Sequence, residues 1–178
     1  SPGQAGLTGE MSMRILVADD DPQVLMCYRK AFASEPTTGV GARLAALSRE
    51  LFVSGKRLAP QPVFEVDECS QGDEAVSRVA NAVRQGQPFD VAILDIRMPP
   101  GINGMEAGRR IRELDPAVPI VFISGYSDIT KDELKARVPP PSKLHFYDKP
   151  LSFGRLAREI TTIVGASAGS RDHVPDER

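Results

Sequence analysis

The stretch VAILDIRMPPGING at residues 91–104 decides the fold. Four apolar residues run without interruption into Asp95, and a loop rich in proline and glycine then leads into an amphipathic stretch that ends near Leu114. A short apolar run of this kind is typical of a strand that is covered on both faces, as strands are in a parallel sheet. A carboxylate at the end of such a strand is costly to bury without a partner, so Asp95 is the first candidate functional residue.

Strand and helix patterns alternate five times along the chain. Apolar runs predict strands at residues 14–18, 63–66, 90–94, 119–123 and 144–147. Amphipathic stretches after them predict helices at residues 22–33, 71–84, 104–114, 128–138 and 152–164. Helix N-caps are expected at Asp21, which precedes a proline, at Ser127 or Asp128, and at Ser152. This alternation predicts a doubly wound α/β domain with a parallel sheet.

The length of 178 residues suits one domain with additional segments. Residues 13–164 are expected to form that domain. A flexible N-terminal linker or expression remnant is expected at 1–12, and a flexible C-terminal tail or linker at 165–178, because both ends are rich in small and polar residues.

An insertion at about 35–62 separates the first predicted helix from the second predicted strand. Apolar residues recur there at helical spacing, and they are Val40, Leu44, Leu47 and Leu51. An added amphipathic helix is expected on this ground. Its apolar stripe would either pack on the parent domain or form a docking or dimer surface.

Composition excludes several classes of function. Lys and Arg together number 22, and Asp and Glu number 24, so the chain lacks the charge pattern of proteins that bind nucleic acid or anionic membranes. No apolar run approaches the roughly 18 residues that a membrane-spanning helix requires. The cysteines Cys27 and Cys69 show neither metal-binding nor CxxC spacing, which favours a reducing compartment. We therefore expect a cytoplasmic protein that binds neither nucleic acid nor membrane directly.

The predicted strands place chemically active side chains at one edge of the sheet, because functional residues of open parallel sheets gather at the carboxyl ends of the strands. Four strand ends supply them: Asp19 and Asp20 after the first strand, Asp95 at the third, Ser124 at the fourth and Lys149 just past the fifth. Clustered carboxylates resist ionising together, and a hard cation with oxygen ligands, such as Mg²⁺, would relieve their repulsion. The alternative for Asp19 and Asp20 is helix capping with dipole stabilisation. The alternative for Asp95 is a structural salt bridge to Lys149.

Asp95 is suited to act as a nucleophile. Its carboxylate would attack a phosphoryl group in line and form an acyl phosphate. Phosphoryl transfer depends mainly on positioning and on neutralising charge, which Mg²⁺ and the ammonium group of Lys149 would supply. The hydroxyl of Ser124 would donate to a phosphoryl oxygen, and Gly125 would leave its approach uncrowded. Pro150 would fix, through a cis or a trans peptide bond, the turn that aims Lys149 at the site.

Four segments of the chain together resemble the receiver domain of bacterial two-component response regulators. They are ILVADDDP at 15–22, VAILDIRMPPGING at 91–104, VFISGYSD at 121–128 and FYDKPL at 146–151. Each motif is weak alone, but the four in this order and spacing are specific. The resemblance covers residues 13–164 apart from the insertion. It implies a flavodoxin-like, doubly wound five-stranded parallel sheet of order 2-1-3-4-5 with helices on both faces.

The resemblance also implies how the site would be used. Asp95 would accept a phosphoryl group from a sensor histidine kinase or a histidine phosphotransfer protein. Mg²⁺ would be bound by Asp20, by Asp95 and by the backbone carbonyl of Arg97, with Asp19 acting through water. The family pattern favours a cis bond before Pro150. A homodimer, and a covalently linked output or kinase domain, remain open as further partners.

The remaining residues have roles in switching and in turnover by the same resemblance. Ser124 would move toward the phosphoryl group, and the ring of Phe146 would turn into the space that it leaves. The surface formed by the fourth helix, the fifth strand and the fifth helix would change with it. Arg97 and Tyr126, with Gly125 between the strand and the loop, would tune how fast water hydrolyses the acyl phosphate.

Three features depart from the family pattern. The loop after Asp95 is about one residue longer than usual, so that Asn103 and Gly104 stand in place of an Asp-Gly turn. The insertion at 35–62 alters a potential partner surface. The prolines at 139–141 are expected to end the fourth helix abruptly. These departures affect dimerisation and output rather than phosphorylation.

Other functions of the same fold fit the residues less well. An aspartyl-phosphate phosphohydrolase usually carries a second acidic residue two positions after its nucleophile, where this chain has Arg97. A phosphorylation-independent, receiver-like interaction module is expected to lack one or more of the acidic or lysine positions, and this chain has all of them. A nucleotide-binding site would require a glycine-rich loop after the first strand. We therefore expect a signalling domain and not an enzyme.

Overall fold

A computed structural model describes residues 12–33, 63–125 and 129–168 of the chain. Most of the predicted linker at 1–12, the insertion at 35–62 and residues 169–178 of the predicted tail lie outside the described residues. Tyr126 lies outside them as well. Within the three described ranges, no helix is both long enough and apolar enough to cross a membrane.

Five parallel strands form one sheet of order β2-β1-β3-β4-β5, which confirms the predicted order. The strands are β1 (Ser12–Ala18), β2 (Val63–Cys69), β3 (Val91–Asp95), β4 (Ile120–Ser124) and β5 (Leu144–Asp148). The helices are α1 (Pro22–Phe32), α3 (Gly72–Arg84), α4 (Gly104–Leu114), α5 (Lys131–Arg137) and α6 (Phe153–Ala168), and a short 3-10 helix, η1 (Pro141–Lys143), precedes β5.

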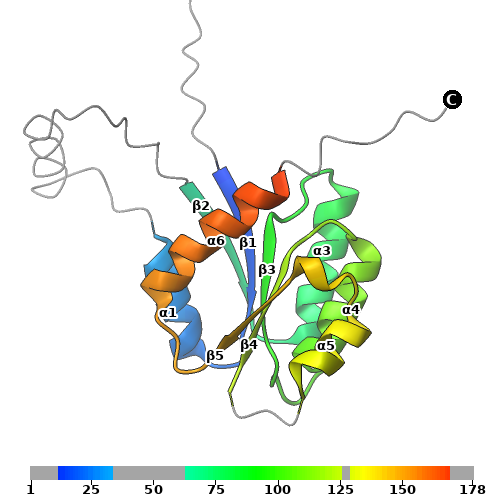
Figure 1. Cartoon of the computed structure of the whole chain (residues 1–178). Coiled ribbons are helices and arrows are strands. Elements are labelled where there is room, and N and C mark those ends of the chain that lie inside the picture. Colours follow the sequence, from blue (N-terminus) through cyan, green and yellow to red (C-terminus); the bar gives the residue numbers. More distant parts are fainter. Residues whose placement is uncertain (1–11, 34–62, 126–128, 169–178) are drawn as a thin grey trace, which may run out of the picture.

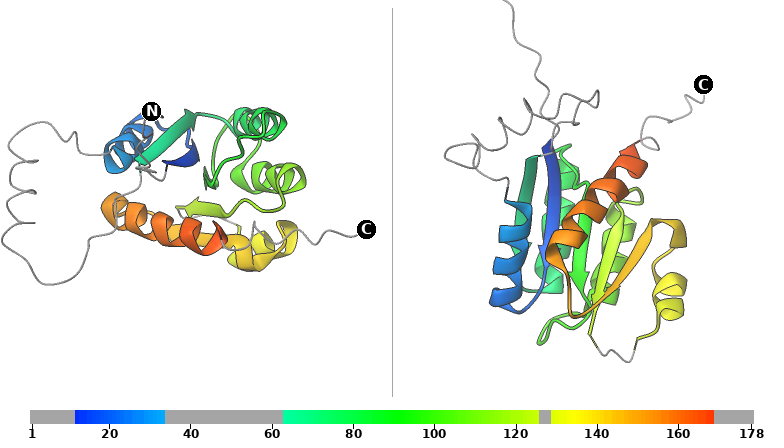
Figure 2. Two further views of the ribbon diagram at one scale, coloured as in Figure 1. Left: turned by 90° about the horizontal axis from the view of Figure 1, so that it is seen from above. Right: turned by 60° about the vertical axis from the view of Figure 1, so that its left-hand side comes forward.

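The helices cover the sheet on both faces (Figures 1 and 2). Helices α1 and α6 lie on one face, and α3, α4 and α5 lie on the other. Neighbouring residues of a strand therefore enter different cores: Ile15 packs with the α1 and α6 side, and Leu16 packs with the opposite side. Since both faces are buried, β3 is apolar at every position before Asp95, and this explains the pattern that identified it.

Local side-chain chemistry sets where the helices begin. The Asp21 side chain accepts a hydrogen bond from the Gln23 amide at 2.8 Å, which confirms the predicted N-cap of α1. The predicted start of α5 was wrong: this helix begins at Lys131, because Thr130 and Glu133 form a reciprocal capping box. The predicted caps, Ser127 or Asp128, lie outside the described residues. Helix α5 ends at Arg137, just before the prolines at 139–141, as predicted.

Strand β2 is longer than its apolar run predicted, since it continues beyond Val66 to Cys69. It lies at the edge of the sheet and pairs with β1 alone, from Ser12 opposite Val63 to Ala18 opposite Cys69. An edge strand has less apolar surface to bury, so polar residues interrupt its pattern. Helix α6 likewise continues to Ala168, four residues past the predicted end, because its last residues include good helix formers.

Candidate functional site

Parallel pairing brings the carboxyl ends of β1, β3, β4 and β5 to one edge of the sheet, at the lower edge of the view in Figure 1. Ala18 lies opposite Leu94, so Asp19 emerges beside Asp95. Asp95 lies opposite Ile123, and Ser124 lies opposite Asp148, the residue before Lys149. The register of the sheet therefore brings the candidate residues selected from the sequence to neighbouring positions.

Three carboxylates form an acidic cluster at this edge. One oxygen from each of Asp19, Asp20 and Asp95 lies within 4.8 Å of the other two. Asp19 and Asp95 are only 1% and 5% exposed, whereas Asp20 is exposed to solvent. The cluster thus has two buried carboxylates and one that faces the solvent.

Hydrogen bonds from backbone amides orient the two buried carboxylates. Oδ1 of Asp19 accepts a hydrogen bond from the Asp21 amide at 3.0 Å. Oδ2 of Asp95 accepts one from the Arg97 amide at 3.2 Å. Each carboxylate is therefore held by the amide two residues further along its own loop, which leaves its other oxygen for a second partner.

That second partner is Lys149. Its Nζ atom lies 3.2 Å from Oδ2 of Asp19 and 3.1 Å from Oδ1 of Asp95. The peptide bond between Lys149 and Pro150 is cis, and the Lys149 amide donates to the Ser124 carbonyl at 2.7 Å. The salt bridge between Asp95 and Lys149, which is the structural alternative for Asp95, is present, and it is shared with Asp19.

The charges of the cluster are not balanced, because one ammonium group faces three carboxylates. Burial raises the pKa of the Asp19 and Asp95 carboxyl groups above their usual range, against the opposing influence of Lys149 and of the backbone amides. Burial also acts to lower the pKa of Lys149, but its contacts with Asp95 and Asp19 together raise it. The site therefore keeps its lysine charged and holds an excess of negative charge.

An oxygen-only donor set of this kind fits a small, hard divalent cation. Mg²⁺ binds through one or two carboxylates, further oxygen atoms and water rather than a complete protein cage. Asp20 and Asp95 can supply carboxylate oxygens, and Asp19 lies close enough to act through water. Arg97 lies in the loop that follows Asp95, two residues beyond it, and is exposed to solvent.

The two predicted switch residues lie on adjacent strands beside a cavity. Ser124 is half-buried at the end of β4, and its hydroxyl donates to the Gly125 carbonyl at 2.7 Å. Phe146 is half-buried on β5, and its ring stacks on Phe122 with centroids 6.1 Å apart. A cavity of about 320 Å³ is lined by both of them and by the apolar side chains of Ile96, Ile129 and Leu134, among others. A Cβ atom added to Gly125 would have no neighbour within 4 Å.

Sequence reasoning did not single out Tyr28. Its side chain is buried on α1, stacks edge-on against Phe153, and has a hydroxyl without a hydrogen-bond partner among the described residues. Burial raises the pKa of this phenol, and the charges of Asp19 and Asp95 raise it further. A tyrosine at an apolar position of an amphipathic helix was the available signal, but only the fold shows that the ring lies near the cluster.

The family model for the response regulator receiver domain matches residues 51–160 of the chain. The chain belongs to this family. Receiver domains are signalling domains of two-component systems, and the predicted family, fold and signalling class are thereby confirmed.

Two relatives show how much of a longer protein this domain represents. The chain is 30% identical over 83 residues to the response regulator protein TmoT of Ectopseudomonas mendocina, which is 47% of this chain and 36% of TmoT. It is 27% identical over 147 residues to the sensor kinase CckA of Brucella abortus, which is 83% of this chain and 15% of CckA. The chain therefore spans about a third or less of the length of these two relatives.

Solved structures show the same fold. A receiver protein from Sinorhizobium medicae superposes with a TM-score of 0.58 at 22% identity, over 88% of this chain and 97% of that one. The response regulator TrrA of Thermotoga maritima, in complex with Mg²⁺ and BeF, superposes with a TM-score of 0.54 at 22% identity, over 85% of this chain and 98% of TrrA.

Proposed function

We propose that Asp95 accepts a phosphoryl group from a sensor histidine kinase or a histidine phosphotransfer protein. The observation that carries this proposal is the convergence of three strand ends on one point. The carboxylates of Asp19, Asp20 and Asp95 lie within 4.8 Å of one another, and the Lys149 ammonium group lies 3.1 Å from Asp95. A structural salt bridge needs one carboxylate and one lysine, and it does not account for two further acids at the same place.

The transfer needs little covalent chemistry from the protein. A carboxylate oxygen of Asp95 forms a bond to phosphorus while the bond between phosphorus and the donor imidazole nitrogen breaks, and the electron pair of that bond stays on the imidazole. Lys149 already contacts Asp95, so its ammonium group would neutralise the charge of a phosphoryl oxygen. The Ser124 hydroxyl, at the end of the adjacent strand β4, would donate to another.

The residues present also fit a role for Mg²⁺. Asp20, Asp95 and the Arg97 carbonyl would hold the ion, with Asp19 acting through water. When bound, Mg²⁺ supplies the positive charge that the transferred group requires. The structure of TrrA in complex with Mg²⁺ and BeF shows that a protein of this fold accommodates such a pair, which supports the proposal for this chain.

Phosphorylation would then act on the output surface through Ser124 and Phe146. Both residues line one cavity, so movement of the serine toward the phosphoryl group opens space that the aromatic ring can enter. The change is a shift of population between two packed arrangements, driven by charge added at the strand ends. The surface of α5, β5 and α6 is the region affected.

Intact-mass measurement tests the proposal directly. The protein is incubated with Mg²⁺ and a small phosphodonor such as acetyl phosphate, and the expected result is one added phosphoryl group. Asp95→Asn should abolish the label. Asp148→Asn is the matched control, since this exposed aspartate also ends a strand of the sheet, β5, and should leave labelling unchanged. Wild-type protein that gains no phosphoryl group would refute the proposal.

The partners follow from the same proposal. CckA is named a sensor kinase and TmoT a response regulator, which supports a histidine kinase as the phosphodonor and a covalently linked kinase or output domain as the recipient of the signal. A homodimer is a further candidate. Cys27 and Cys69 are both free thiols, which supports a location in the cytoplasm.

A further inference from the structure

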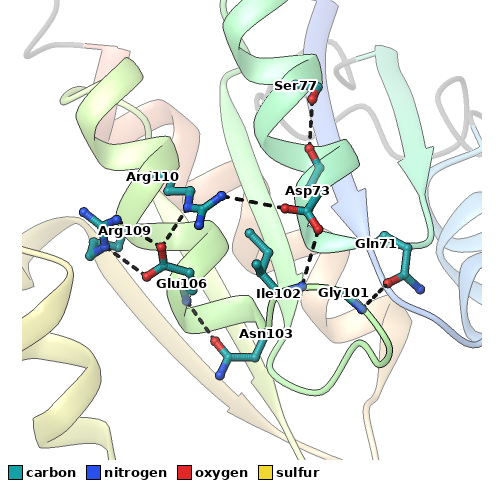
Figure 3. Close-up of polar contacts among 9 residues, drawn as sticks. All are labelled: Gln71, Asp73, Ser77, Gly101, Ile102, Asn103, Glu106, Arg109 and Arg110. Atoms are coloured by element: carbon teal, nitrogen blue, oxygen red, sulfur yellow. Dashed lines mark hydrogen bonds and ion pairs between the residues drawn. The ribbon is translucent and has the colours of Figure 1, made fainter.

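The turn between β2 and α3 holds the loop that follows Asp95 (Figure 3). Nε2 of Gln71 donates to the Pro99 carbonyl at 3.1 Å, and Oε1 of the same side chain accepts from the Gly101 amide at 3.1 Å. One side-chain amide thus bonds a backbone acceptor and a backbone donor two residues apart, as a neighbouring strand would. We refer to these two hydrogen bonds as the Gln71 clamp.

Glycines on both sides make this close approach possible. A Cβ atom at Gly101 would lie 2.8 Å from Oε1 of Gln71. A Cβ atom at Gly72 would lie 2.6 Å from the carbonyl oxygen of Ile102. Asp73 adds a longer contact, with Oδ2 3.5 Å from the Ile102 amide. A side chain at Gly72 would push the turn and the loop apart, and one at Gly101 would displace the Gln71 side-chain amide.

The clamped loop is attached to the site at its other end. The Arg97 amide donates to Asp95 Oδ2 at 3.2 Å, and the Gly104 amide closes the loop by donating to the Ile96 carbonyl at 2.9 Å. A Cβ atom at Gly104 would overlap the carbonyl oxygen of Asp95. Residues 97–103 therefore form a closed loop whose base rests on the backbone of Asp95.

The tip of this loop has few other restraints. Met98 is buried and anchors its first half, but Pro99, Pro100 and Gly101 are exposed. Within the described part of the chain, the hydrogen bonds that reach the tip come from Gln71 and Asp73. An exposed loop without such bonds samples many backbone conformations, and binding a ligand to it carries the free-energy cost of ordering it.

We propose that Gln71 is a positioning residue for the phosphorylation site: its clamp fixes the loop that presents the Arg97 carbonyl, and it thereby raises the affinity of the site for a divalent cation. The inference rests on the function proposed above. Residues that orient the ligands of a metal commonly govern its affinity without touching it. Gln71 is the described side chain best placed to do so, because it holds the loop at two points.

The test compares Gln71→Met with Gln85→Met. Methionine keeps the length of glutamine and removes both hydrogen bonds, and Gln85 is an exposed glutamine at the other end of α3. Titration calorimetry with MgCl₂ should show Gln71→Met binding about 3- to 10-fold more weakly, since a net hydrogen bond is worth about that factor. Gln85→Met should match the wild type.

Two further readouts separate positioning from general loss of structure. In the metal-free protein, hydrogen exchange by NMR should show that Gln71→Met exposes the Gly101 amide, while amides in β3 stay protected. In acetyl phosphate labelling, Gln71→Met should need more Mg²⁺ for half-maximal rate and should reach the wild-type rate at saturation.

A second variant disrupts the same contact by a change in the loop. Gly101→Ala places a Cβ atom against Oε1 of Gln71, so it should weaken Mg²⁺ binding in the same direction. The double variant should be little weaker than either single variant, because both changes break one contact.

Three results would overturn the inference. If the wild type is labelled and Gln71→Met binds Mg²⁺ equally well, the clamp has no positioning role and the proposed function stands. If Gln71→Met also lowers the rate at saturating Mg²⁺ together with the melting temperature, its role is structural. If the wild type neither binds Mg²⁺ nor accepts a phosphoryl group, the proposed function fails, and the clamp inference fails with it.

Discussion

Asp95→Asn should stabilise the metal-free protein, because burial of the Asp95 carboxylate is unfavourable and its repulsion by the neighbouring acids nearly offsets its attraction to Lys149. At an effective dielectric constant of about 20, the Asp95 carboxylate is repelled by Asp19, within 4.8 Å, by about 3 kcal/mol and attracted by Lys149, at 3.1 Å, by about 5 kcal/mol. Repulsion from the exposed Asp20 brings these charge effects close to cancelling. The burial of Asp95, which is the largest cause of its raised pKa, therefore decides the sign. We expect the free energy of unfolding to rise by about 1–2 kcal/mol, the scale on which neutral replacements of buried charged groups stabilise proteins.

The pH dependence of this gain follows from the direction of the shift. A carboxyl group whose pKa is raised by folding binds its proton more tightly in the folded protein than in the unfolded chain, where the value is 3.8. The free energy of unfolding of the wild type therefore falls as pH rises from 3.8 through the folded pKa, and it stays lower above that window. The advantage of Asp95→Asn should be complete near neutral pH and should disappear below about pH 4.

Magnesium should reverse the order of stability. A ligand that binds only the folded state stabilises it by about 2.7 kcal/mol at a concentration 100 times its dissociation constant. The wild type should gain on this scale, whereas Asp95→Asn, which lacks one of the proposed ligands, should gain much less. If Asp95 is a ligand of a divalent cation, Asp95→Asn should be more stable than the wild type in EDTA and should gain less stability from Mg²⁺.

Urea unfolding followed by circular dichroism, in EDTA and in saturating Mg²⁺, measures both effects. Asp148→Asn is the control, because Asp148 forms an ion pair with Lys131 at 3.5 Å but its side chain is 70% exposed. Its removal should change the free energy of unfolding by no more than about 0.5 kcal/mol. If Asp95→Asn is instead less stable than the wild type in EDTA at neutral pH, then Asp95 is mainly a structural partner of Lys149, and the reasoning from the burial of its carboxylate is wrong.

Three further substitutions, the first with a matched control, test the packing of the fold by the same urea measurement. Gly104→Ala should lower the free energy of unfolding by at least about 2 kcal/mol, because the added Cβ overlaps the carbonyl of Asp95. The control is Gly154→Ala, in open space on α6, which should be neutral or up to about 1 kcal/mol stabilising. Equal effects of the two substitutions would contradict this prediction. Tyr28→Phe should be neutral or stabilise by about 1 kcal/mol, since the buried hydroxyl it removes has no partner among the described residues, and a loss of stability would show that the hydroxyl is bonded. Arg112→Met should cost about 2–4 kcal/mol, because this buried guanidinium donates to two main-chain carbonyls before β4, and a neutral result would show that those carbonyls find other donors.

Local sequence patterns predicted the kinds of elements well where the physical cause is local. Strand β3 is buried on both faces, so each of its residues before Asp95 had to be apolar, and the run was visible in one dimension. Helix α4 begins at Gly104 and ends at Leu114, as its periodicity predicted. The start of α5 was misplaced, since the choice among several nearby polar residues depends on which one completes a capping box.

The site residues were accessible to sequence reasoning for a different reason. The rule that parallel strands present their functional residues at their carboxyl ends turns five separate positions into one location. The strand order, however, came from a family resemblance, because five parallel strands can be arranged in many ways that leave the same local patterns. The order places β1 between β2 and β3, and this arrangement brings Asp19 beside Asp95.

Contacts between segments that are distant in the sequence were beyond sequence reasoning. Gln71 and Gly101 are 30 residues apart, and nothing in either local pattern indicates that an amide of one would meet the backbone of the other. The same holds for Tyr28, whose position near the acidic cluster depends on how α1 rests on the sheet. Such contacts depend on how the loops close and on how the helices pack on the sheet. The spacing of apolar residues along the chain carries no information about either.

Sequence alone thus determined the chemistry available to this protein: a carboxylate at the end of a buried strand, with two more acids, a hydroxyl and a lysine at other strand ends. Tertiary structure decided how those groups share their charges. In the folded protein Lys149 forms ion pairs with both Asp19 and Asp95, and the three carboxylates of the cluster outnumber this one ammonium group. The physical reason is that residue type and periodicity are properties of the chain, whereas distance and burial, which set the energies of charges, exist only once the strands are paired.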